Sequence, residues 1–183
     1  FEDEAFLEME KKHKILQISD FVQENFSKDK FSDSTFIFEQ FAKVISRSSL
    51  VSRFEKPAFK DFSKSYLDHK RFANCVYEMM HGNEKKGFEL LVEILSQYKL
   101  AKWPIVTAFL AYKAPDEHVF IKPTTTKKII KYFEVDLFYQ PKPTYEFYLG
   151  YKKFINALKA KSSQGLQVHN PAYCGFLLLA IED

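Results

Sequence analysis

Glycine, cysteine, arginine and tryptophan are scarce in this chain of 183 residues, and each shortage excludes a class of site. The five glycines are too dispersed to form a glycine-rich phosphate loop, and the GxGxxG, GxxxxGK[ST], HExxH and GxSxG motifs are absent. Cys75 and Cys174 lie far apart with no CxxC pair, which excludes a disulfide framework and a zinc knuckle. Common nucleotide-dependent and hydrolase sites are therefore disfavoured, and we predict no metal site and no cofactor.

Long apolar runs are also missing, and we expect no targeting signal. The longest apolar runs, such as residues 176–181, have six residues, whereas a membrane-spanning helix needs about 20. The first ten residues hold five acidic side chains, unlike the basic start of a secretory or transit peptide. Two free thiols suit a reducing compartment. We therefore expect a cytoplasmic protein that has no membrane partner.

Lysine and phenylalanine are the abundant residues. The chain has 20 Phe, and all but three of its 27 basic residues are Lys. Both amino acids have A/T-rich codons, so the net charge of +3 is only weak evidence for an anionic partner. The few arginines disfavour base-specific reading of nucleic acid, because the guanidinium group binds phosphate and guanine in a bidentate way that Lys cannot. The length and the hydrophobic content of 46% fit one compact domain.

Apolar residues recur at helical spacing along nearly the whole chain. Ile15, Ile18, Val22 and Phe26 form the first such stripe. Further stripes are Phe38/Phe41/Ile45, Phe59/Phe62/Tyr66, Phe72/Val76/Met79, Phe88/Leu91/Val92/Leu95, Ile105/Ala108/Phe109/Tyr112, Ile129/Ile130/Phe133 and Tyr148/Tyr151/Phe154/Ile155/Leu158. This pattern predicts an all-α protein: a single-domain, irregular bundle of seven to nine helices over residues 1–183. Within it, residues 1–102 form an N-terminal part and residues 103–183 a basic C-terminal part.

Polar capping residues and prolines predict where these helices begin and end. The expected N-caps are Asp33 or Ser34, Asn83, Thr124 or Thr125, and Thr144. Residues 118–123 have some strand character but are short and isolated, so we interpret them as an extended connector. Pro141 and Pro143 predict a stiff turn, and residues 161–170 are the most loop-like segment.

Two Glu-x-x-His pairs resemble half of a di-iron carboxylate site. They are Glu10 with His13 and Glu78 with His81, and i, i+3 spacing places each pair on one helix face. The remaining ligands would have to come from other helices, nominally from Glu39, Glu89 or Glu93. The first pair lies in a charged, solvent-facing run and Gly82 ends the helix after the second. We interpret both pairs as chance spacing.

The segment from Pro115 to Lys128 is the best candidate for an anion site. Here an extended connector leads into a threonine-rich helix start, where free backbone N–H groups and the positive end of the helix dipole favour anions. The candidate anion-binding residues are His118, Lys122, Thr124, Thr125, Thr126, Lys127 and Lys128. The alternative is that a threonine caps the helix while the lysines face water.

Lysines and tyrosines interleave after this segment, as they do in proteins that bind single-stranded nucleic acid. The candidate nucleic-acid contacts are Lys131, Tyr139, Lys142, Tyr145, Lys152 and Lys153. Packing is the alternative, because several tyrosines fall at core spacing. Residues 126–148 can also be read as a helix-turn-helix, but the segment Gln140–Pro143 is stiffer and longer than that turn tolerates.

The second half of the chain resembles a bacterial family of uncharacterised helical proteins. The resemblance rests on Trp103-Pro104, Phe109-Leu110-Ala111, Pro115-x-x-His118-Val-Phe-Ile-Lys122-Pro123-x-x-Thr126-Lys127 and Tyr139-x-Pro141-x-Pro143-x-Tyr145. It covers residues 103–183 and implies a helical fold without a known activity.

Three hypotheses of function follow. The first is a cytosolic all-α binding module whose basic surface, Lys122–Lys153, contacts a nucleic acid or an acidic protein. The second is an enzyme in which His118 acts as acid or base while Lys122 and Thr126 hold an oxyanion or phosphate. The third is a structural protein in which the phenylalanine excess leaves an apolar patch for self-association.

Overall fold

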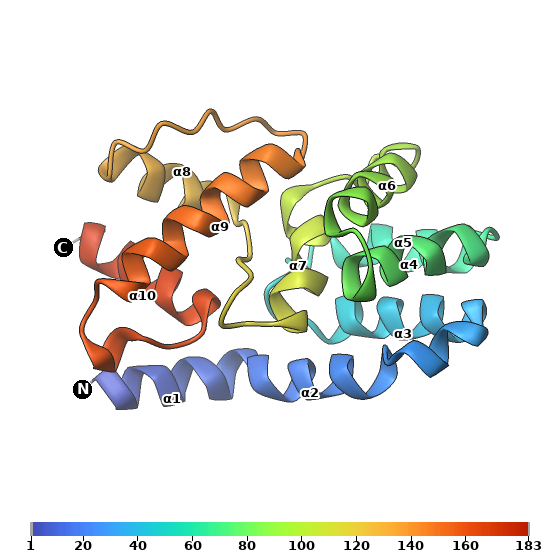
Figure 1. Cartoon of the computed structure of the whole chain (residues 1–183), viewed down its shortest axis with the longest axis horizontal. Helices are drawn as coiled ribbons and strands as arrows, with labels where there is room; N and C mark the ends of the chain where they lie inside the picture. Colours follow the sequence, from blue (N-terminus) through green and yellow to red (C-terminus); the bar gives the residue numbers. More distant parts are fainter. Residues whose placement is uncertain (1, 183) are drawn as a thin grey trace.

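A computed structural model of the chain describes residues 2–182, which form ten α-helices and two short 3-10 helices without any strand (Figure 1). The α-helices are α1 (Glu2–His13), α2 (Ile15–Asn25), α3 (Ser34–Arg47), α4 (Lys56–Ser65), α5 (His69–His81), α6 (Glu84–Ser96), α7 (Trp103–Lys113), α8 (Pro123–Tyr132), α9 (Tyr145–Ala160) and α10 (Asn170–Glu182). The 3-10 helices are η1 (Lys28–Ser32) and η2 (Gln164–Leu166). The all-α prediction is confirmed, and the predicted seven to nine helices were too few.

The helix that sequence reasoning missed is α1. It runs end to end with α2 along one edge of the molecule (Figure 1), and Lys14 between them is in the left-handed conformation with φ 50°. A left-handed residue ends a helix. The Leu16 N–H in the first turn of α2 donates to Glu10 Oε1 of α1 at 2.7 Å, which ties the two helices together. Because α1 is rich in charged residues, apolar spacing alone does not reveal this break.

Most of the predicted helix starts are confirmed. The side chains of Asp33, Asn83 and Thr144 accept hydrogen bonds from the backbone N–H groups of α3, α6 and α9, respectively. The prediction that Thr124 or Thr125 caps α8 was wrong. That helix begins one residue earlier, with Lys122 as N-cap and Pro123 in its first position. Proline suits this position because its fixed φ is already helical and its missing N–H would be unpaired there.

Helix α7 lies at the centre of the fold and is buried on all sides. Its residues from Trp103 to Tyr112 are buried with the exception of Pro104. A helix that is apolar all round belongs in the interior, and α7 packs against α2, α3 and α6. The sequence predicted a buried stripe on one face of this helix, whereas the structure buries all of its faces.

Phenylalanine rings account for much of the packing between α7 and the N-terminal helices. The ring of Phe109 on α7 lies 5.0 Å from that of Phe26 and 5.1 Å from that of Phe41. Phe41 in turn meets Phe72 of α5 edge to face at 4.9 Å. Aromatic pairs at these distances contribute stability beyond the area they bury. The phenylalanine content is therefore largely core packing.

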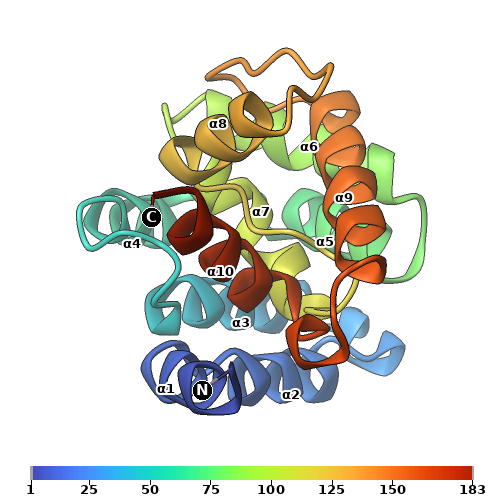
Figure 2. The ribbon, with the colours of Figure 1, turned by 90° about the vertical axis from the view of Figure 1, so that its left-hand side faces the viewer.

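The connector after α7 is extended, as predicted, and leads to α8, α9 and α10, which share the face seen in Figure 2. The Ile121 N–H of the connector donates to Thr107 Oγ1 of α7 at 3.0 Å, so the connector is fixed to the central helix. Across residues 2–182, no helix combines the length and the apolar character needed to span a bilayer.

Candidate functional site

A hollow of about 670 Å³ lies between α3 and α4, and we call it the α3–α4 groove. Its volume falls in the range typical of ligand sites. The lining residues are Phe38, Glu39, Ala42, Lys43, Ile45, Ser46, Arg53, Lys56, Pro57, Phe59, Lys60 and Ser63. Phe38, Ile45 and Phe59 are buried and form an apolar floor. Ala42 is only half-buried, and its short side chain leaves the hollow open.

The two helices that form the groove run antiparallel. Near one end the ring of Phe38 on α3 lies 6.0 Å from that of Phe62 on α4. In the middle Phe41 lies 6.1 Å from Phe59. At the other end the Lys56 ammonium donates to the Ser46 carbonyl at 3.0 Å. Residue numbers therefore increase along α3 from the Phe38 end of the groove to the Ser46 end, and along α4 in the opposite direction.

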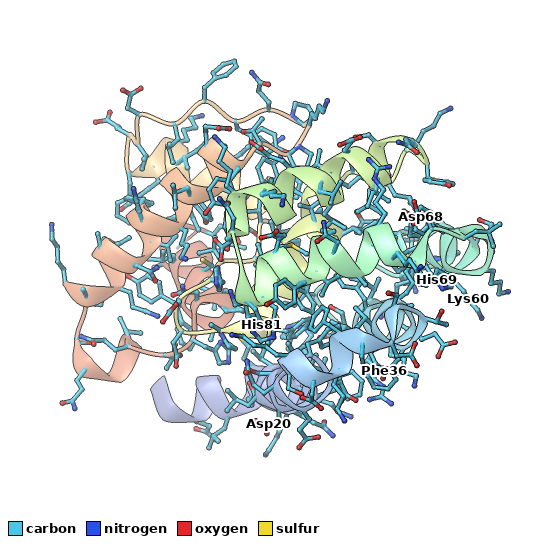
Figure 3. The ribbon with its side chains drawn as sticks, turned by 45° about the vertical axis from the view of Figure 1, so that its right-hand side comes forward. Asp20, Phe36, Lys60, Asp68, His69 and His81 are labelled. Atoms are coloured by element: carbon cyan, nitrogen blue, oxygen red, sulfur yellow. The ribbon has the colours of Figure 1, made fainter. Side chains whose placement is uncertain are left out.

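The groove is strongly biased toward positive charge. Its lining holds Lys43, Arg53, Lys56 and Lys60 against the single carboxylate of Glu39. The cations and the carboxylate are not evenly distributed. Arg53 and Lys56 share the end near Ser46, while Glu39 lies toward the opposite end. Figure 3 shows Lys60 on α4 at the edge of the molecule, where its side chain is exposed.

An exposed aromatic ring lies next to the basic end of the groove. Phe54 is 79% exposed, although large apolar side chains are usually buried. The Arg53 guanidinium, which lines the groove, lies 5.0 Å from the centre of this ring in a cation–π contact. Aromatic residues and arginine are both enriched at protein interfaces relative to the rest of the surface.

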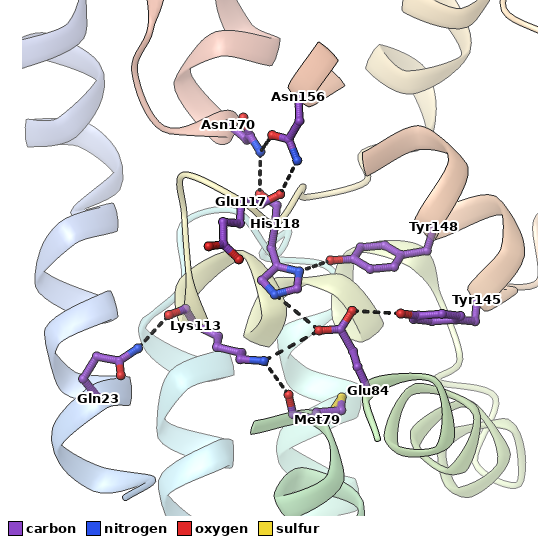
Figure 4. A network of polar contacts seen from close by, with 10 residues as sticks. All are labelled: Gln23, Met79, Glu84, Lys113, Glu117, His118, Tyr145, Tyr148, Asn156 and Asn170. Atoms are coloured by element: carbon purple, nitrogen blue, oxygen red, sulfur yellow. Dashed lines mark hydrogen bonds and ion pairs between the residues drawn. The ribbon is translucent and has the colours of Figure 1, made fainter. Parts of the chain in front are cut away.

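A second polar cluster surrounds His118 and joins four segments of the fold (Figure 4). The His118 Nδ1 atom lies 2.5 Å from the Tyr148 hydroxyl on α9, and Nε2 lies 3.4 Å from Glu84 Oε2 on α6. Glu84 also accepts a hydrogen bond from the Tyr145 hydroxyl at 3.0 Å and lies 3.6 Å from the Lys113 ammonium. We call these residues the His118 network.

The His118 imidazole is neutral at ordinary pH. Burial, together with the charges of Lys152 and Lys113, lowers its pKa from 6.5 to about 3. The Glu84 carboxylate would favour a charged imidazole, but its neighbour Lys113 offsets it, so burial prevails. Burial also raises the pKa of Tyr148 well above 10. Tyr148 therefore donates to Nδ1, and the proton of the neutral imidazole lies on Nε2, which is 3.4 Å from Glu84 Oε2.

Further hydrogen bonds hold the backbone on either side of His118. Asn170 at the start of α10 donates from Nδ2 to the His118 carbonyl at 3.2 Å and to Asn156 Oδ1 at 2.9 Å. Asn156 donates to the Glu117 carbonyl at 2.8 Å. The His118 network therefore fixes the connector against α6 and α9, and Asn170 fixes it against α10. No residue of the His118 network lines any of the four prominent hollows of the described chain.

The predicted anion site is divided between the interior and the surface. His118 and Thr126 are only 2% and 1% exposed, and Thr126 forms a side-chain hydrogen bond with Tyr151. Lys122, Thr124, Lys127 and Lys128 are exposed and Thr125 is half-buried. Neither His118, Lys122 nor Thr126 lines any of the four prominent hollows of the described chain. The convergence that the enzyme hypothesis requires is therefore not seen at these hollows.

The exposed cations of that predicted site contact separate segments. Burial is the main cause of the lowered pKa of His13 on α1, and the charge of nearby Lys122 adds to it. Lys127 lies 5.4 Å from the centre of the Tyr139 ring. Lys128 pairs with Glu182 in the last turn of α10. These neighbours belong to three different parts of the surface.

The predicted nucleic-acid contacts are similarly mixed. Lys131, Lys142 and Lys153 are exposed, whereas Tyr139, Tyr145 and Lys152 are half-buried. The Tyr139 ring packs against Trp103 and Phe147, with centroids 6.3 and 5.7 Å away. Tyr145 packs on Phe88 at 5.5 Å and binds Glu84. Both tyrosine rings have packing partners within the fold.

The two Glu-x-x-His pairs each bind elsewhere in the fold. Glu10 accepts from His169 Nε2 at 3.0 Å, and His13 contacts Ser49 at 2.8 Å. His81 contacts the Phe26 carbonyl at 2.7 Å. Among the side chains that the structure describes, no group of three or more His, Cys, Asp or Glu is placed to hold a metal ion.

Comparisons with known proteins give no identity to the chain. No protein family matches it, and neither a characterised protein nor a solved structure shows a significant match. The resemblance seen in residues 103–183 stays a prediction. Function is therefore inferred from the geometry of this chain alone.

Sequence reasoning missed the α3–α4 groove, although part of its signal is present. Lys56, Lys60 and Lys64 recur at i, i+4 beside the Phe59/Phe62 stripe, which indicates a basic edge along an apolar face. The space left over Ala42 could not be predicted, because it depends on how α3 and α4 pack.

Proposed function

We propose that the protein is a binding module whose anionic partner docks in the α3–α4 groove through apolar side chains. The observation that carries this proposal is the excess of four cations over one carboxylate around an apolar floor. Charges at the rim of an interface steer and orient a partner, while the buried apolar contacts give most of the affinity. Exposed Phe54 beside Arg53 extends this surface at the basic end.

The groove supports the binding hypothesis better than the surface Lys122–Lys153. Its cations border one hollow with an apolar floor. On the other surface, Lys128 pairs with an acid, and Lys122 lines none of the four prominent hollows. Arg53 adds a guanidinium to the groove, which suits bidentate contact with a carboxylate. The class of partner thus stays anionic, and an acidic protein segment is favoured over a nucleic acid.

We also propose that the module works in the cytoplasm. Cys75 and Cys174 are free and buried, which suits a reducing compartment. Burial raises the pKa of the Cys75 thiol well above its ordinary value and raises that of the Cys174 thiol to about 12. Both thiols therefore stay protonated and unreactive.

The experiment uses the fluorescent dye anilinonaphthalene sulfonate, which combines an aromatic body with one negative charge. We expect the folded wild-type protein to bind it, and we expect Ala42→Leu to weaken that binding at least about fivefold, because a larger side chain fills the hollow. Lys60→Glu should weaken it by a similar factor through charge repulsion. Matched controls are Ala58→Leu, on an exposed position of α4 outside the groove, and Lys28→Glu, on an exposed position of η1.

Single-stranded DNA provides the competing class of partner. The proposal is contradicted if the wild-type protein binds an oligonucleotide more tightly than the dye and the groove variants bind that oligonucleotide as tightly as the wild type. That result favours the Lys122–Lys153 surface. Equal dye binding by Ala42→Leu and Ala58→Leu also contradicts the proposal. Circular dichroism of each variant checks that the fold is unchanged.

A further inference from the structure

We propose that the docked segment is an amphipathic helix with an acidic carboxyl end, and that this end lies over Arg53 and Lys56. This inference rests on the proposed function of the α3–α4 groove. It adds the secondary structure of the partner, its charge pattern and its direction relative to Glu39.

The length and shape of the groove favour a helix. From Phe38 to Ser46 the lining of α3 covers about 12 Å, which is about two helical turns. Two turns present apolar side chains at i, i+3 or i+4, and i+7, the pattern by which helices dock in grooves. A volume of about 670 Å³ has room for several such side chains. The lining side chains come from two ridges, α3 and α4, that match a third helix lying between them.

An amphipathic helix also fits the open side of the groove. The lining combines buried Phe38 and Phe59 with exposed Lys43 and Lys60, so it passes from apolar floor to charged rim. A helix buries its apolar stripe on such a floor while its polar face stays in water. A bound alkyl chain would leave apolar surface wet on the open side, which costs free energy.

The charge distribution gives the direction. Arg53 and Lys56 lie at the end near Ser46, whereas Glu39 lies toward the other end. The carboxyl end of a helix carries partial negative charge and its amino end partial positive charge. Lys60 lies one turn along α4 from Lys56, toward Glu39, and offsets that carboxylate, so the excess positive charge is at the end of Arg53 and Lys56. A helix with acidic residues in its last turns therefore gains more attraction when its carboxyl end lies over Arg53 and Lys56 than in the reverse direction.

The test uses two synthetic peptides of about 14 residues with the same composition and the same leucine stripe. One has glutamates in its carboxyl half and lysines in its amino half, and the other has the reverse. We expect the first to bind about threefold more tightly, because only in the first do the acidic side chains and the negative end of the helix dipole lie together over the basic end of the groove. The reverse peptide is intrinsically the better helix, because its charges complement its own dipole, so helicity alone predicts the opposite order.

Two further reagents separate direction from helicity. With a nitroxide label at its carboxyl end, the first peptide should broaden the amide signals near Ser46 in the wild type. In the double variant Glu39→Lys/Arg53→Glu, which changes only exposed side chains, it should broaden those near Phe38 instead. A third peptide has the acidic carboxyl half of the first and a proline in the middle, which breaks the helix but keeps the charges. We expect it to lose at least about tenfold in affinity.

The outcomes are distinguishable. Dye binding in the groove with no binding of any peptide overturns the helix inference and leaves the proposed function in place. Equal affinity of the proline peptide also overturns the helix, and equal affinity of the first two peptides overturns the acidic carboxyl end. Broadening near Phe38 by the labelled carboxyl end in the wild type overturns the direction. Loss of both dye and peptide binding contradicts the proposed function itself.

Discussion

The Tyr148 hydroxyl and the His118 Nδ1 atom lie 2.5 Å apart in the interior, and this contact determines which nitrogen of the neutral imidazole carries the proton. Tyr148 donates, because burial keeps its pKa well above 10 while that of His118 falls to about 3. The remaining Nε2–H then faces Glu84. This arrangement holds residues 114–122 in place and makes the His118 network a source of stability.

The neutral state of His118 predicts a dependence of stability on pH. The pKa of His118 is about 3 in the folded protein, against 6.5 for a histidine exposed to water as in the unfolded chain. Between these values the unfolded state binds more protons, so stability falls as the pH falls below about 6.5. The expected loss from His118 is about 2 kcal/mol between about pH 7 and about pH 5. Urea denaturation at several pH values measures it.

The control for this prediction is His118→Gln, which removes the titrating group and retains a donor that can reach Glu84. Its stability should be lower at neutral pH and should change less on acidification. Parallel pH profiles for the wild type and His118→Gln would show that His118 is not the group responsible.

Removal of the Tyr148 hydroxyl should destabilise the protein. In Tyr148→Phe the buried Nδ1 acceptor of His118 loses its partner, and a buried unsatisfied polar atom costs about 1 to 3 kcal/mol. Tyr132→Phe is the matched control, since Tyr132 is 60% exposed and its substitution should change stability by less than about 0.5 kcal/mol. The free energy of unfolding in urea distinguishes them, and equal values contradict the role of Tyr148.

Two glycine substitutions should have opposite effects. A Cβ atom at Gly87 of α6 would meet the Met79 backbone nitrogen at 2.6 Å and the Cys75 carbonyl at 2.8 Å, so α5 and α6 would have to separate. We expect Gly87→Ala to cost at least about 1 to 3 kcal/mol. A Cβ at Gly150 of α9 meets only the end of the Leu137 side chain. Because this side chain can move, Gly150→Ala should stabilise by up to about 1 kcal/mol.

Thermal unfolding followed by circular dichroism gives both values. A Gly87→Ala protein as stable as Gly150→Ala would contradict the close approach of α5 and α6. Cys75→Ala removes the thiol that donates to the Gly87 carbonyl without adding atoms at Gly87. It therefore measures how much stability the loss of this hydrogen bond costs by itself, apart from the steric effect of the added Cβ.

Local signals predicted most of the helices. The stripes of α2 and α5 and the caps Asp33 and Asn83 were found because spacing and capping act over a few residues. The cap of α8 was misjudged because two rules competed, and proline at the first position prevailed over a threonine cap. The break at Lys14 has no sequence signal, because lysine rarely adopts a left-handed conformation.

The candidate sites could be predicted only in part. His118 was identified as a chemically interesting residue, but its contacts with Glu84 and Tyr148 join segments far apart in the sequence. The same holds for the α3–α4 groove, in which the charge pattern is local but the hollow over Ala42 arises from packing. Periodicity gives the buried face of each helix and says little about which faces meet.

The most direct test of the account is a map of backbone amide chemical shifts as the peptide with the acidic carboxyl half is added to the folded protein. The account predicts that the shifts that change concentrate in residues 38–46 and 53–63, and that the changes are lost in Ala42→Leu but not in Ala58→Leu. Changes concentrated in residues 122–153 instead, with the α3–α4 groove unaffected, would contradict it.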